Sequence, residues 1–332
     1  MNKNTYAAIM AGGIGSRFWP SSRTSNPKQF LDILGVGRTL IQSTYDRFLK
    51  ICPKENIFIL THTDYIDLVK EQLPDIQDFQ ILTEPARKNT APCIAYSAFK
   101  INKLNPDANI IVAPSDHIIL NEEEFVRIAN LTLDFVSKNN ALATLGIRPS
   151  RPDTGYGYIQ YFEEEAGKEI HKVKTFTEKP EKAVAKQFIK SGDFLWNAGI
   201  FIWNVKSILE SLETNLTEVY EAFAEAEKSM LTPEENKAVE EAFITSPSIS
   251  VDYGVMEKAK NVYVVPSSFG WSDLGTWASL FAEKEKDYLN NAVNGKNVVV
   301  YDSSNNLINV PDNKLVVIQG LENYIVVDTD DV

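Results

Sequence analysis

Residues 11–20 read Ala11-Gly12-Gly13-Ile14-Gly15-Ser16-Arg17-Phe18-Trp19-Pro20, and they follow directly on the apolar run Tyr6 to Met10. The run has the length and composition of a buried strand, so the three glycines come where a strand of an open α/β sheet delivers its carboxyl end. Backbone amides exposed in such a turn can hold phosphate oxygens. The loop therefore predicts a phosphate site formed by Ala11, Gly12, Gly13, Gly15 and Ser16.

Two familiar phosphate-binding motifs do not fit this loop. A dinucleotide fingerprint starting at Gly13 would need a small residue in place of Phe18, and the Gly-Lys-Ser/Thr end of a Walker A loop does not occur in the chain. Two cations do accompany the loop, Arg17 within it and Lys28 in the segment Asn26-Pro27-Lys28-Gln29-Phe30. They could neutralise a triphosphate. On the glycines alone, a tight turn flanked by solvated charges is an equally good interpretation.

Short apolar runs alternate with longer amphipathic stretches along the first half of the chain, which is typical of βα units. Examples are the runs Ile57 to Leu60 and Asn109 to Ala113 and the amphipathic stretch Glu122 to Lys138. We therefore predict an α/β, doubly wound Rossmann-like domain. Between about 207 and 245 the pattern becomes helical and acidic, which predicts a helical insertion within a domain spanning 1–286.

Short alternating runs separated by Asn, Asp and Gly turns predict a β-rich C-terminal domain over 287–332. Stacked rungs of a partial left-handed β-helix and an ordinary β-sandwich would both bury such runs. The last three residues come abruptly after a strand, which a truncated C-terminus would explain. The runs are Asn297 to Tyr301, Leu307 to Val310, Leu315 to Ile318 and Tyr324 to Val327.

Composition excludes several classes of protein. The chain has 332 residues, 44% of them hydrophobic, which is enough for a full α/β core and a smaller second unit. Its net charge of −12 argues against a nucleic-acid partner, because binders of the phosphate backbone need a basic face. No apolar run approaches membrane-spanning length, and no signal-peptide pattern precedes the first strand. We expect a cytoplasmic protein that binds neither nucleic acid nor membranes.

Further motifs follow the loop in order along most of the chain. Together with Gly12-Gly13-x-Gly15-x-Arg17-x-x-Pro20 and Pro27-Lys28-Gln29-Phe30, they resemble the sugar-nucleotide pyrophosphorylases, and within these the mannose-1-phosphate guanylyltransferase branch. The motifs are Glu84-Pro85-x-Arg87-Lys88-Asn89-Thr90-Ala91-Pro92, Pro114-Ser115-Asp116-His117, Thr154-Gly155-Tyr156-Gly157-Tyr158, Phe176-Thr177-Glu178-Lys179-Pro180, Leu195-Trp196-Asn197-Ala198-Gly199, Ser250-Val251-Asp252-Tyr253 and Gly270-Trp271-Ser272-Asp273-Leu274-Gly275.

The resemblance implies a single-activity transferase that uses Mg2+ and whose partners are GTP and mannose 1-phosphate. Such an enzyme transfers GMP from GTP to α-D-mannose 1-phosphate and releases pyrophosphate. The sugar phosphate would attack the α-phosphorus directly and in line, because it already carries an anionic oxygen. The residues that the resemblance implies as catalytic are Arg17, Lys28, Asp116, Lys179 and Asp273.

Two aspartates are candidate ligands for Mg2+. Asp116 follows Ser115 and the apolar run Asn109 to Ala113, so we expect it at a strand's carboxyl end near the glycine loop. Asp273 lies between Trp271 and Gly275. Taken alone, each aspartate is more typical of a helix cap or a turn. The resemblance implies instead that both occupy metal-binding positions, where one or two carboxylates suffice for Mg2+.

Five residues are candidates for the sugar phosphate: Gly157, Glu178, Lys179, Asn197 and Asp252. The ammonium of Lys179 could hold the phosphate, while Glu178 and the amide of Asn197 could bind sugar hydroxyls. A solvated charge pair would explain Glu178 and Lys179 if they stood alone. The segment around Gly157 could equally be an aromatic hairpin packed on the core, and Asp252 could equally have a structural hydrogen-bonding role.

The resemblance places the base near Glu84, Asn89 and Thr90, where Glu84 could accept from guanine. It also implies that Ser115 and Asp116 bind the nucleotide. One alternative is an enzyme of the same reaction class that uses another nucleotide or sugar. A second is a catalytically dead sensor of nucleotide sugars, which would keep the fold without turnover. A glycosyltransferase of related fold would need an Asp-x-Asp metal motif, which Asp116-His117-Ile118 does not supply. Exposed edges of the β-rich C-terminal domain favour a homodimer.

Overall fold

The computed structural model describes residues 2–163, 169–329 and 331–332. The chain divides into two compact units, each assembled from segments that are distant in sequence. The helix α1 (Leu40–Phe48) and the short strands β5 (Ile118–Ile119) and β11 (Trp271–Ser272) contain points where the chain passes between the units. Unit 1 comprises residues 1–12, 44–115 and 119–271, and unit 2 comprises residues 13–43, 116–118 and 272–332.

Unit 1 is built on a mixed sheet in the order β3-β2-β1-β4-β9-β6-β10-β8-β7. β3, β2, β1 and β4 are parallel neighbours, as are β6 and β10. The sheet contains β1 (Thr5–Met10), β2 (Ile57–His62), β3 (Ile81–Glu84), β4 (Asn109–Pro114), β6 (Leu142–Ile147), β7 (Tyr158–Tyr161), β8 (His171–Thr177), β9 (Phe194–Asn204) and β10 (Val262–Ser267).

The sheet is mixed rather than parallel because β9 runs antiparallel between β4 and β6. β9 is a continuous apolar strand with nearly every side chain buried, as a strand covered on both faces requires. It also pairs with β7, so one strand joins the parallel part of the sheet to the antiparallel β7 and β8. The doubly wound arrangement predicted from the sequence therefore describes the β1–β4 part, within a mixed α/β fold.

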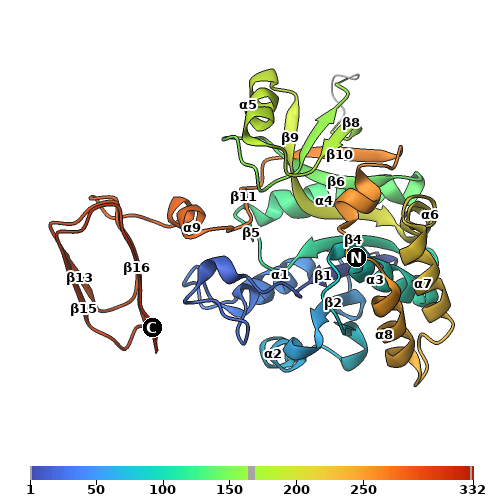
Figure 1. Cartoon of the computed structure of the whole chain (residues 1–332), viewed down its shortest axis with the longest axis horizontal. Coiled ribbons are helices and arrows are strands. Elements are labelled where there is room, and N and C mark those ends of the chain that lie inside the picture. Colours follow the sequence, from blue (N-terminus) through green and yellow to red (C-terminus); the bar gives the residue numbers. More distant parts are fainter. Residues whose placement is uncertain (1, 164–168, 330) are drawn as a thin grey trace. The chain divides into compact units, whose positions relative to one another are not determined.

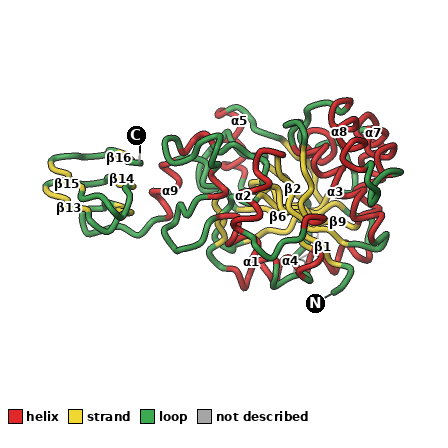
Figure 2. Tube along the Cα trace, turned by 90° about the horizontal axis from the view of Figure 1, so that it is seen from below, coloured by secondary structure: helices red, strands yellow, loops and turns green. Residues whose placement is uncertain are grey.

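Helices lie on both sides of this sheet (Figure 2). α3 (Thr90–Leu104) packs on the sheet face that carries Tyr6, Ala8 and Ile110, and its own residues from Ala91 to Ile101 are buried. The amphipathic α4 (Glu122–Lys138) contacts β4, β6 and β9, and it begins after Asn121, whose side chain accepts from Glu124 N. Two further helices of unit 1 are α2 (Ile66–Gln72) and α5 (Lys182–Ser191).

Three helices follow β9, in the range where the sequence predicts a helical insertion. They are α6 (Val205–Asn215), α7 (Thr217–Glu227) and α8 (Glu235–Thr245), and they pack against one another and against α3 (Figure 1). Phe223 and Phe243 from this group pack with Tyr96 of α3. A buried ion pair between Lys100 of α3 and Glu235 of α8 adds to that contact.

Unit 2 has a small core to which its three chain segments contribute. Phe18, Ile33 and Leu40 come from residues 13–43, and Ile118 comes from residues 116–118. Residues 272–332, which include α9 (Trp277–Glu283), contribute Leu274, Leu280, Ala292 and Leu307. Two short 3-10 helices, Ser16–Phe18 and Lys28–Phe30, lie in its N-terminal segment. This core fixes the glycine loop and the residues after β11 in one compact body.

The C-terminal strands form a β-rich region in which neighbouring strands pair in parallel. β12, β14 and β16 form one sheet and β13 and β15 another. The fully buried Asn306 bonds to Asn291 and to Tyr324, 15 and 18 residues away, so it ties successive turns together. The strands are β12 (Ala292–Asn294), β13 (Val298–Tyr301), β14 (Leu307–Asn309), β15 (Val316–Gln319) and β16 (Ile325–Val327).

Neither cysteine in the described chain is bonded to another: Cys52 and Cys93 are both free and buried. Among the described residues, no helix is long and apolar enough to cross a membrane.

Candidate active site

The glycine loop begins where β1 ends and belongs largely to unit 2. Gly15 has a φ of 62°, and a Cβ at this position would lie 2.5 Å from Cβ of Lys28, so both backbone conformation and space require glycine. Ser22 Oγ donates to Gly15 O at 2.5 Å, and Gln29 Nε2 donates to Gly13 O at 2.8 Å. These bonds hold the loop against the segment that carries Lys28.

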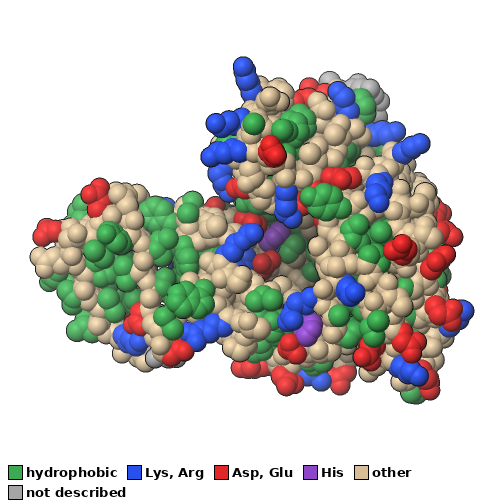
Figure 3. All heavy atoms as spheres, viewed as in Figure 1, with side chains coloured by type: hydrophobic (Ala, Val, Ile, Leu, Met, Phe, Trp, Pro, Cys, Tyr) green, Lys and Arg blue, Asp and Glu red, His purple; other side chains and the backbone are tan. Residues whose placement is uncertain are grey.

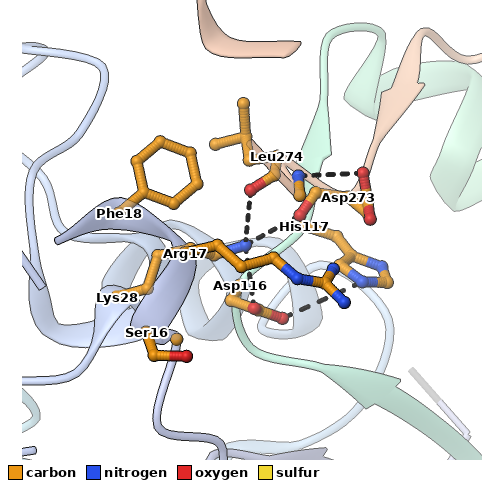
Figure 4. A pocket seen from close by; sticks show the side chains of 10 residues that line it. Ser16, Arg17, Phe18, Lys28, Asp116, His117, Asp273 and Leu274 are labelled. Atoms are coloured by element: carbon orange, nitrogen blue, oxygen red, sulfur yellow. Dashed lines mark hydrogen bonds and ion pairs between the residues drawn. The ribbon is translucent and has the colours of Figure 1, made fainter. Parts of the chain in front are cut away.

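A cavity of about 240 Å³ opens beside this loop, entirely within unit 2 (Figure 4). Arg17 is exposed, and within the described part of the chain it makes no ion pair. Its guanidinium is therefore available to an anion that enters the cavity. The cavity is lined by Gly15, Ser16, Arg17, Phe18, Lys28, Asp116, His117, Asp273, Leu274 and Gly275.

Lys28 lies at the inner wall of the cavity and is only 4% exposed. Its Nζ lies 2.9 Å from Asp116 Oδ2 and donates to Asp273 O at 2.7 Å and to Leu274 O at 3.2 Å. The Nζ is also 5.7 Å from the centre of the Phe18 ring. Figure 4 shows the side chain reaching from one wall of the cavity to these three oxygens. The ammonium is thus held by the protein itself.

The two aspartates of the cavity present carboxylates to its interior. Burial alone would raise the pKa of Asp116, but the neighbouring Lys28 and His117 outweigh it and hold that pKa below its ordinary value. His117 Nε2 lies 3.8 Å from Asp116 Oδ1. Asp273 Oδ1 accepts from Gly275 N at 3.0 Å, which fixes the turn after β11. Asp116 therefore remains a carboxylate well below neutral pH.

This donor set fits Mg2+. The described residues contain no group of three or more His, Cys, Asp or Glu side chains that could enclose a metal. Mg2+ does not need such a cage, because it retains several waters and is bound by one or two carboxylates together with substrate phosphates. Asp116 and Asp273, with a phosphate-sized cavity between loop and turn, match that requirement.

Leu274 has a φ of 44°, an uncommon conformation for a leucine. Its side chain is fully buried in the core of unit 2 beside Phe18, and its carbonyl accepts from Lys28. The core therefore holds a strained backbone in place beside Asp273. Strain of this kind persists only where the surroundings over-determine it, and it is concentrated at functional sites.

The predicted sugar-phosphate residues come together in unit 1. The Nζ of Lys179 lies 2.9 Å from Glu178 Oε1, and the Lys179 side chain is 57% exposed. Asn197 Nδ2 donates to Asp252 Oδ1 at 2.8 Å. A side chain at Gly157 would collide with Glu178 Oε2, so glycine is needed there to admit the carboxylate. All five predicted residues thus form one group.

This group contains two carboxylates, Glu178 and Asp252, and one of their oxygens lacks a hydrogen-bond partner. Glu178 Oε2 is buried and has no hydrogen-bond partner in the described structure. Burial, and next the negative charge of Glu178, raise the pKa of Asp252 to about 6. A buried acceptor without a partner is costly, and a sugar hydroxyl could satisfy it. A charged phosphate would meet the exposed ammonium of Lys179.

Glu84, at the end of β3, lies apart from these residues but also in unit 1. Its carboxylate is buried, and a Cβ on Gly12 would lie 2.9 Å from its Oε1. Burial raises the pKa of Glu84 to about 7, against the opposing effects of a hydrogen bond with Cys93 and the charge of Arg87. Glu84 thus faces the start of the glycine loop. Ala11, whose carbonyl accepts from Thr61 Oγ1, lies in the same stretch.

Asn89, Thr90 and Ser115 have structural partners. Asn89 has a φ of 68°, and its side chain accepts from Thr90 N at the start of α3. Thr90 Oγ1 accepts from Val251 N, which ties α3 to the π-helical turn Asp252–Met256. Ser115 is buried and its carbonyl accepts from Thr44 Oγ1. None of these bonds tests a contact with a base or a phosphate, so the nucleotide roles of these residues stay predictions.

The structure therefore sorts the predicted residues into three groups. Unit 2 joins the loop, Arg17, Lys28, Asp116 and Asp273, whereas unit 1 holds the sugar-phosphate group and, separately, the Glu84 region. Sequence reasoning did not select His117, Leu274 or Cys93 as site residues. In the sequence, His117 is next to Asp116, Leu274 is next to Asp273, and Cys93 lies one helical turn after Asn89. Adjacency alone does not show that a side chain shares a cavity.

Comparison with known proteins decides the family. The model of the nucleotidyl transferase family matches residues 6–290, which is most of the chain. The chain belongs to the nucleotidyl transferase family. The mixed α/β sheet of unit 1 is the sheet of a nucleotidyltransferase fold, and the glycine loop, Asp116 and Asp273 all lie inside the matched residues.

Relatives of this nucleotidyl transferase carry informative names. It is 36% identical over 338 residues to mannose-1-phosphate guanylyltransferase of Salmonella muenchen, covering 98% of this chain and 70% of the relative. It is also 36% identical to alginate biosynthesis protein AlgA of Pseudomonas fluorescens, covering 97% of this chain and 67% of the relative. A solved structure from Thermus thermophilus, described as mannose-1-phosphate geranyltransferase, has a TM-score of 0.88 at 31% identity and covers 99% of this chain and 93% of that one.

Proposed function

We propose that this nucleotidyltransferase is a mannose-1-phosphate guanylyltransferase that transfers GMP from GTP to α-D-mannose 1-phosphate, giving GDP-mannose and pyrophosphate. Its substrates are accordingly a nucleoside triphosphate and a sugar phosphate. The names of its relatives support the choice of sugar and nucleotide. The observation that carries the chemistry is the cavity of unit 2, where the exposed Arg17 and the carboxylates of Asp116 and Asp273 line one space.

Mg2+ is the cofactor of this proposal, and Asp116 and Asp273 are the residues that would hold it. The bound ion would supply charge neutralisation for the triphosphate, as divalent cations generally do in phosphoryl transfer. The protein carries the remaining positive charge. Arg17 meets the triphosphate, Lys28 adds a second cation at the inner wall, and the amides of Gly13, Gly15 and Ser16 contribute N–H donors.

The reaction needs no covalent intermediate and no general base. A phosphate oxygen of mannose 1-phosphate attacks the α-phosphorus of GTP, a new oxygen–phosphorus bond forms, and the bond to the β-phosphate oxygen breaks, so that pyrophosphate leaves. Lys179 binds the sugar phosphate through its exposed ammonium. Glu178, Asn197 and Asp252 bind sugar hydroxyls, which supplies the unpartnered Glu178 Oε2 with a donor.

Glu84 is the proposed base-recognition residue. A carboxylate accepts from both N1 and the exocyclic amine of guanine, which adenine and the pyrimidines do not present together. The buried position of the Glu84 carboxyl beside Gly12 supports this role. Asn89 and Thr90, which begin α3, would bound the same pocket.

We also propose the limits of the two domains, the fold of the second domain, the cellular location and the oligomeric state. Residues 1–286 form the catalytic domain, with the insertion at about 207–245, and the end of the family match at residue 290 supports this limit. Residues 287–332 form a partial left-handed β-helix, supported by the parallel pairing of β12 with β14 and β14 with β16. The protein acts in the cytoplasm as a homodimer, and exposed apolar side chains on the C-terminal strands support self-association (Figure 3).

Purified protein assayed with GTP, mannose 1-phosphate and Mg2+ tests the reaction. We expect pyrophosphate release that requires both substrates and is lost when the metal is chelated. Asp116→Asn and Asp273→Asn should each lose about 100-fold or more of the turnover, because each removes a charge from the metal site. Wild-type protein without turnover, or either variant with normal turnover, would remove the support for this assignment.

A further inference from the structure

Two of the predicted sugar-phosphate residues are held by backbone hydrogen bonds to the segment that leads into β7. Lys179 N donates to Tyr156 O at 3.2 Å, and Asn197 N donates to Gly157 O at 2.8 Å. Two consecutive carbonyls therefore fix the backbones that carry the ammonium and the amide proposed to bind the substrate. A movement of residues 156–157 would displace both of these side chains together.

Lys179 depends on this support because its backbone conformation is unusual. Its φ is 46°, which is uncommon for a residue with a side chain, and Pro180 follows it. A residue before a proline normally adopts an extended conformation. A strained backbone persists only where its surroundings over-determine it. Two contacts do so here: the bond from Lys179 N to Tyr156 O, and the bond from Glu178 N to Glu257 Oε1 at 3.0 Å.

Arg151 packs on the aromatic residue next to each carbonyl bond. Its guanidinium carbon lies 5.9 Å from the centre of the Tyr156 ring and 5.2 Å from that of the Trp196 ring, and its Nη2 donates to Tyr156 Oη at 3.3 Å. The two rings meet edge to face, with 4.9 Å between their centres. Tyr156 precedes Gly157 and Trp196 precedes Asn197 in the chain. One cation thus joins the two segments that carry these site residues.

Asp153 orients the guanidinium over the rings. Arg151 Nε donates to Asp153 Oδ2 at 3.0 Å, and Nη2 lies 2.8 Å from the same oxygen. Asp153 Oδ1 accepts from Gly155 N at 2.9 Å, and Tyr158 Oη donates to the carbonyl of Asp153. The Arg151 side chain is 53% exposed, so the ion pair alone contributes little to stability. Its effect is to fix the plane of the guanidinium.

We infer that Arg151 is a positioning residue of the sugar-phosphate site, because it holds Tyr156 against Trp196. The carbonyls of residues 156 and 157 in turn hold Lys179 and Asn197 in place. Arg151 acts through these residues and does not contact the substrate. The inference rests on the proposed function for the identity of the substrate, and it assigns Arg151 an effect on the sugar phosphate and none on GTP.

Steady-state kinetics test the effect on the substrate. Arg151→Met removes the cation, so the KM for mannose 1-phosphate should rise about tenfold, while kcat and the KM for GTP each change by less than about threefold. Arg151→Lys keeps a charge over the rings and loses the fork of donors, so that KM should rise only about threefold. Arg148→Met, at an exposed arginine, is the control and should change neither KM. An unchanged KM for mannose 1-phosphate in Arg151→Met, or equal rises for both substrates, would overturn the inference.

Hydrogen exchange measures the same positioning without substrate. The amides of Lys179 and Asn197 donate to the two carbonyls, so both should exchange about tenfold faster in Arg151→Met than in the wild type, as NMR would show. In Arg148→Met both rates should stay at the wild-type value. Wild-type exchange of these two amides in Arg151→Met would show that Arg151 does not hold the turn, and the inference would be wrong.

A double variant separates positioning from direct contact with the phosphate. If Arg151 acts through Tyr156, Arg151→Met/Tyr156→Ala should raise the KM for mannose 1-phosphate less than about threefold beyond Tyr156→Ala alone. Fully additive effects would mean that Arg151 binds the substrate itself and would overturn the inference. Failure of the proposed function is distinct, because the wild type would then show no turnover, and hydrogen exchange would still decide whether Arg151 holds Lys179 and Asn197.

Discussion

Gly157 lies so close to Glu178 that any side chain at position 157 would occupy the place of Glu178 Oε2. That oxygen is buried and has no hydrogen-bond partner in the described structure, and the other oxygen binds Lys179. The two motifs are separate in the sequence, but in the structure the position of one depends on the other. The missing side chain of one makes room for the carboxylate of the other, and the carboxylate in turn holds the ammonium.

Gly157→Ala should therefore weaken the binding of the sugar phosphate and leave the binding of GTP unchanged. The added methyl displaces Glu178 and with it Lys179, so the KM for mannose 1-phosphate should rise by about tenfold, while the KM for GTP changes by less than about twofold. Steady-state kinetics with each substrate varied checks this. Gly155→Ala is the matched control, because its Cβ meets only the Asp153 side chain at 3.2 Å. Equal effects of both variants would count against the role given to Gly157.

Lys179→Met should reduce kcat/KM for mannose 1-phosphate by about 100-fold, because it removes the exposed cation proposed for the substrate phosphate. Initial rates at saturating GTP measure this. The control is Lys182→Met in the first turn of α5, an exposed lysine three residues further on. Near-normal kinetics in Lys179→Met would reject the assigned role, whatever the control shows.

Glu84 should make the stability of the protein depend on pH. Burial raises its pKa to about 7 from an ordinary value of 4.5, so between these values the folded state holds a proton that the unfolded state has released. Stability therefore falls as pH rises from about 4.5 to 7, and above pH 7 the ionised carboxylate costs roughly 3 kcal/mol.

Glu84→Gln removes this cost. We expect the variant to melt at a higher temperature than the wild type at pH 8 and at about the same temperature at pH 4.5, as calorimetry would show. The exposed Glu71→Gln on α2 is the control and should shift the melting temperature at neither pH. A Glu84→Gln effect of equal size at both pH values would mean that ionisation of Glu84 is not the cause.

The helical insertion should depend on one buried ion pair. Lys100 and Glu235 have side chains that are 7% and 12% exposed, and Tyr96 also donates to Glu235. Lys100→Met leaves Glu235 buried without its cation, so we expect a loss of about 3 kcal/mol in the free energy of unfolding, measured in urea. The exposed pair of Lys206 and Asp107 is the control, and Lys206→Met should cost less than about 1 kcal/mol. Equal losses would contradict this account of the insertion.

The sequence predicts the helices and strands whose local periodicity indicates which of their side chains are buried. The run before the glycine loop is β1, the run before Asp116 is β4, and the amphipathic stretch Glu122–Lys138 is α4. The C-terminal runs became short strands close to their predicted positions. Each of these follows from local periodicity, which a single sequence contains.

The direction of β9 could not be read in the same way. Its apolar run from Phe194 to Asn204 is compatible with either direction, and the direction is set by β7, β8 and α5, which precede it. The burial of Lys28 is a similar case. A lysine after Pro27 reads as a surface charge, and only the distant Asp116 and Leu274 make it an interior one.

For the site residues, too, the sequence could predict some properties and not others. Motif resemblance selected residues that the structure places in common groups, such as Glu178 with Asn197 and Asp252 or Arg17 with Asp273. It could not distinguish an exposed cation from a buried one, because the burial of a side chain is a property of the folded chain. That distinction separates Arg17 from Lys28.

A panel of nucleoside triphosphates tests the proposed guanylyltransferase reaction directly. Purified protein with Mg2+ and mannose 1-phosphate is incubated with GTP, ATP, UTP, CTP and dTTP in parallel, released pyrophosphate is measured, and the nucleotide sugar formed is identified by mass spectrometry. We expect pyrophosphate and GDP-mannose with GTP and little product with the other four. An equal or larger yield with another triphosphate, or no nucleotide sugar from any of them in a folded protein that binds GTP, would contradict this assignment.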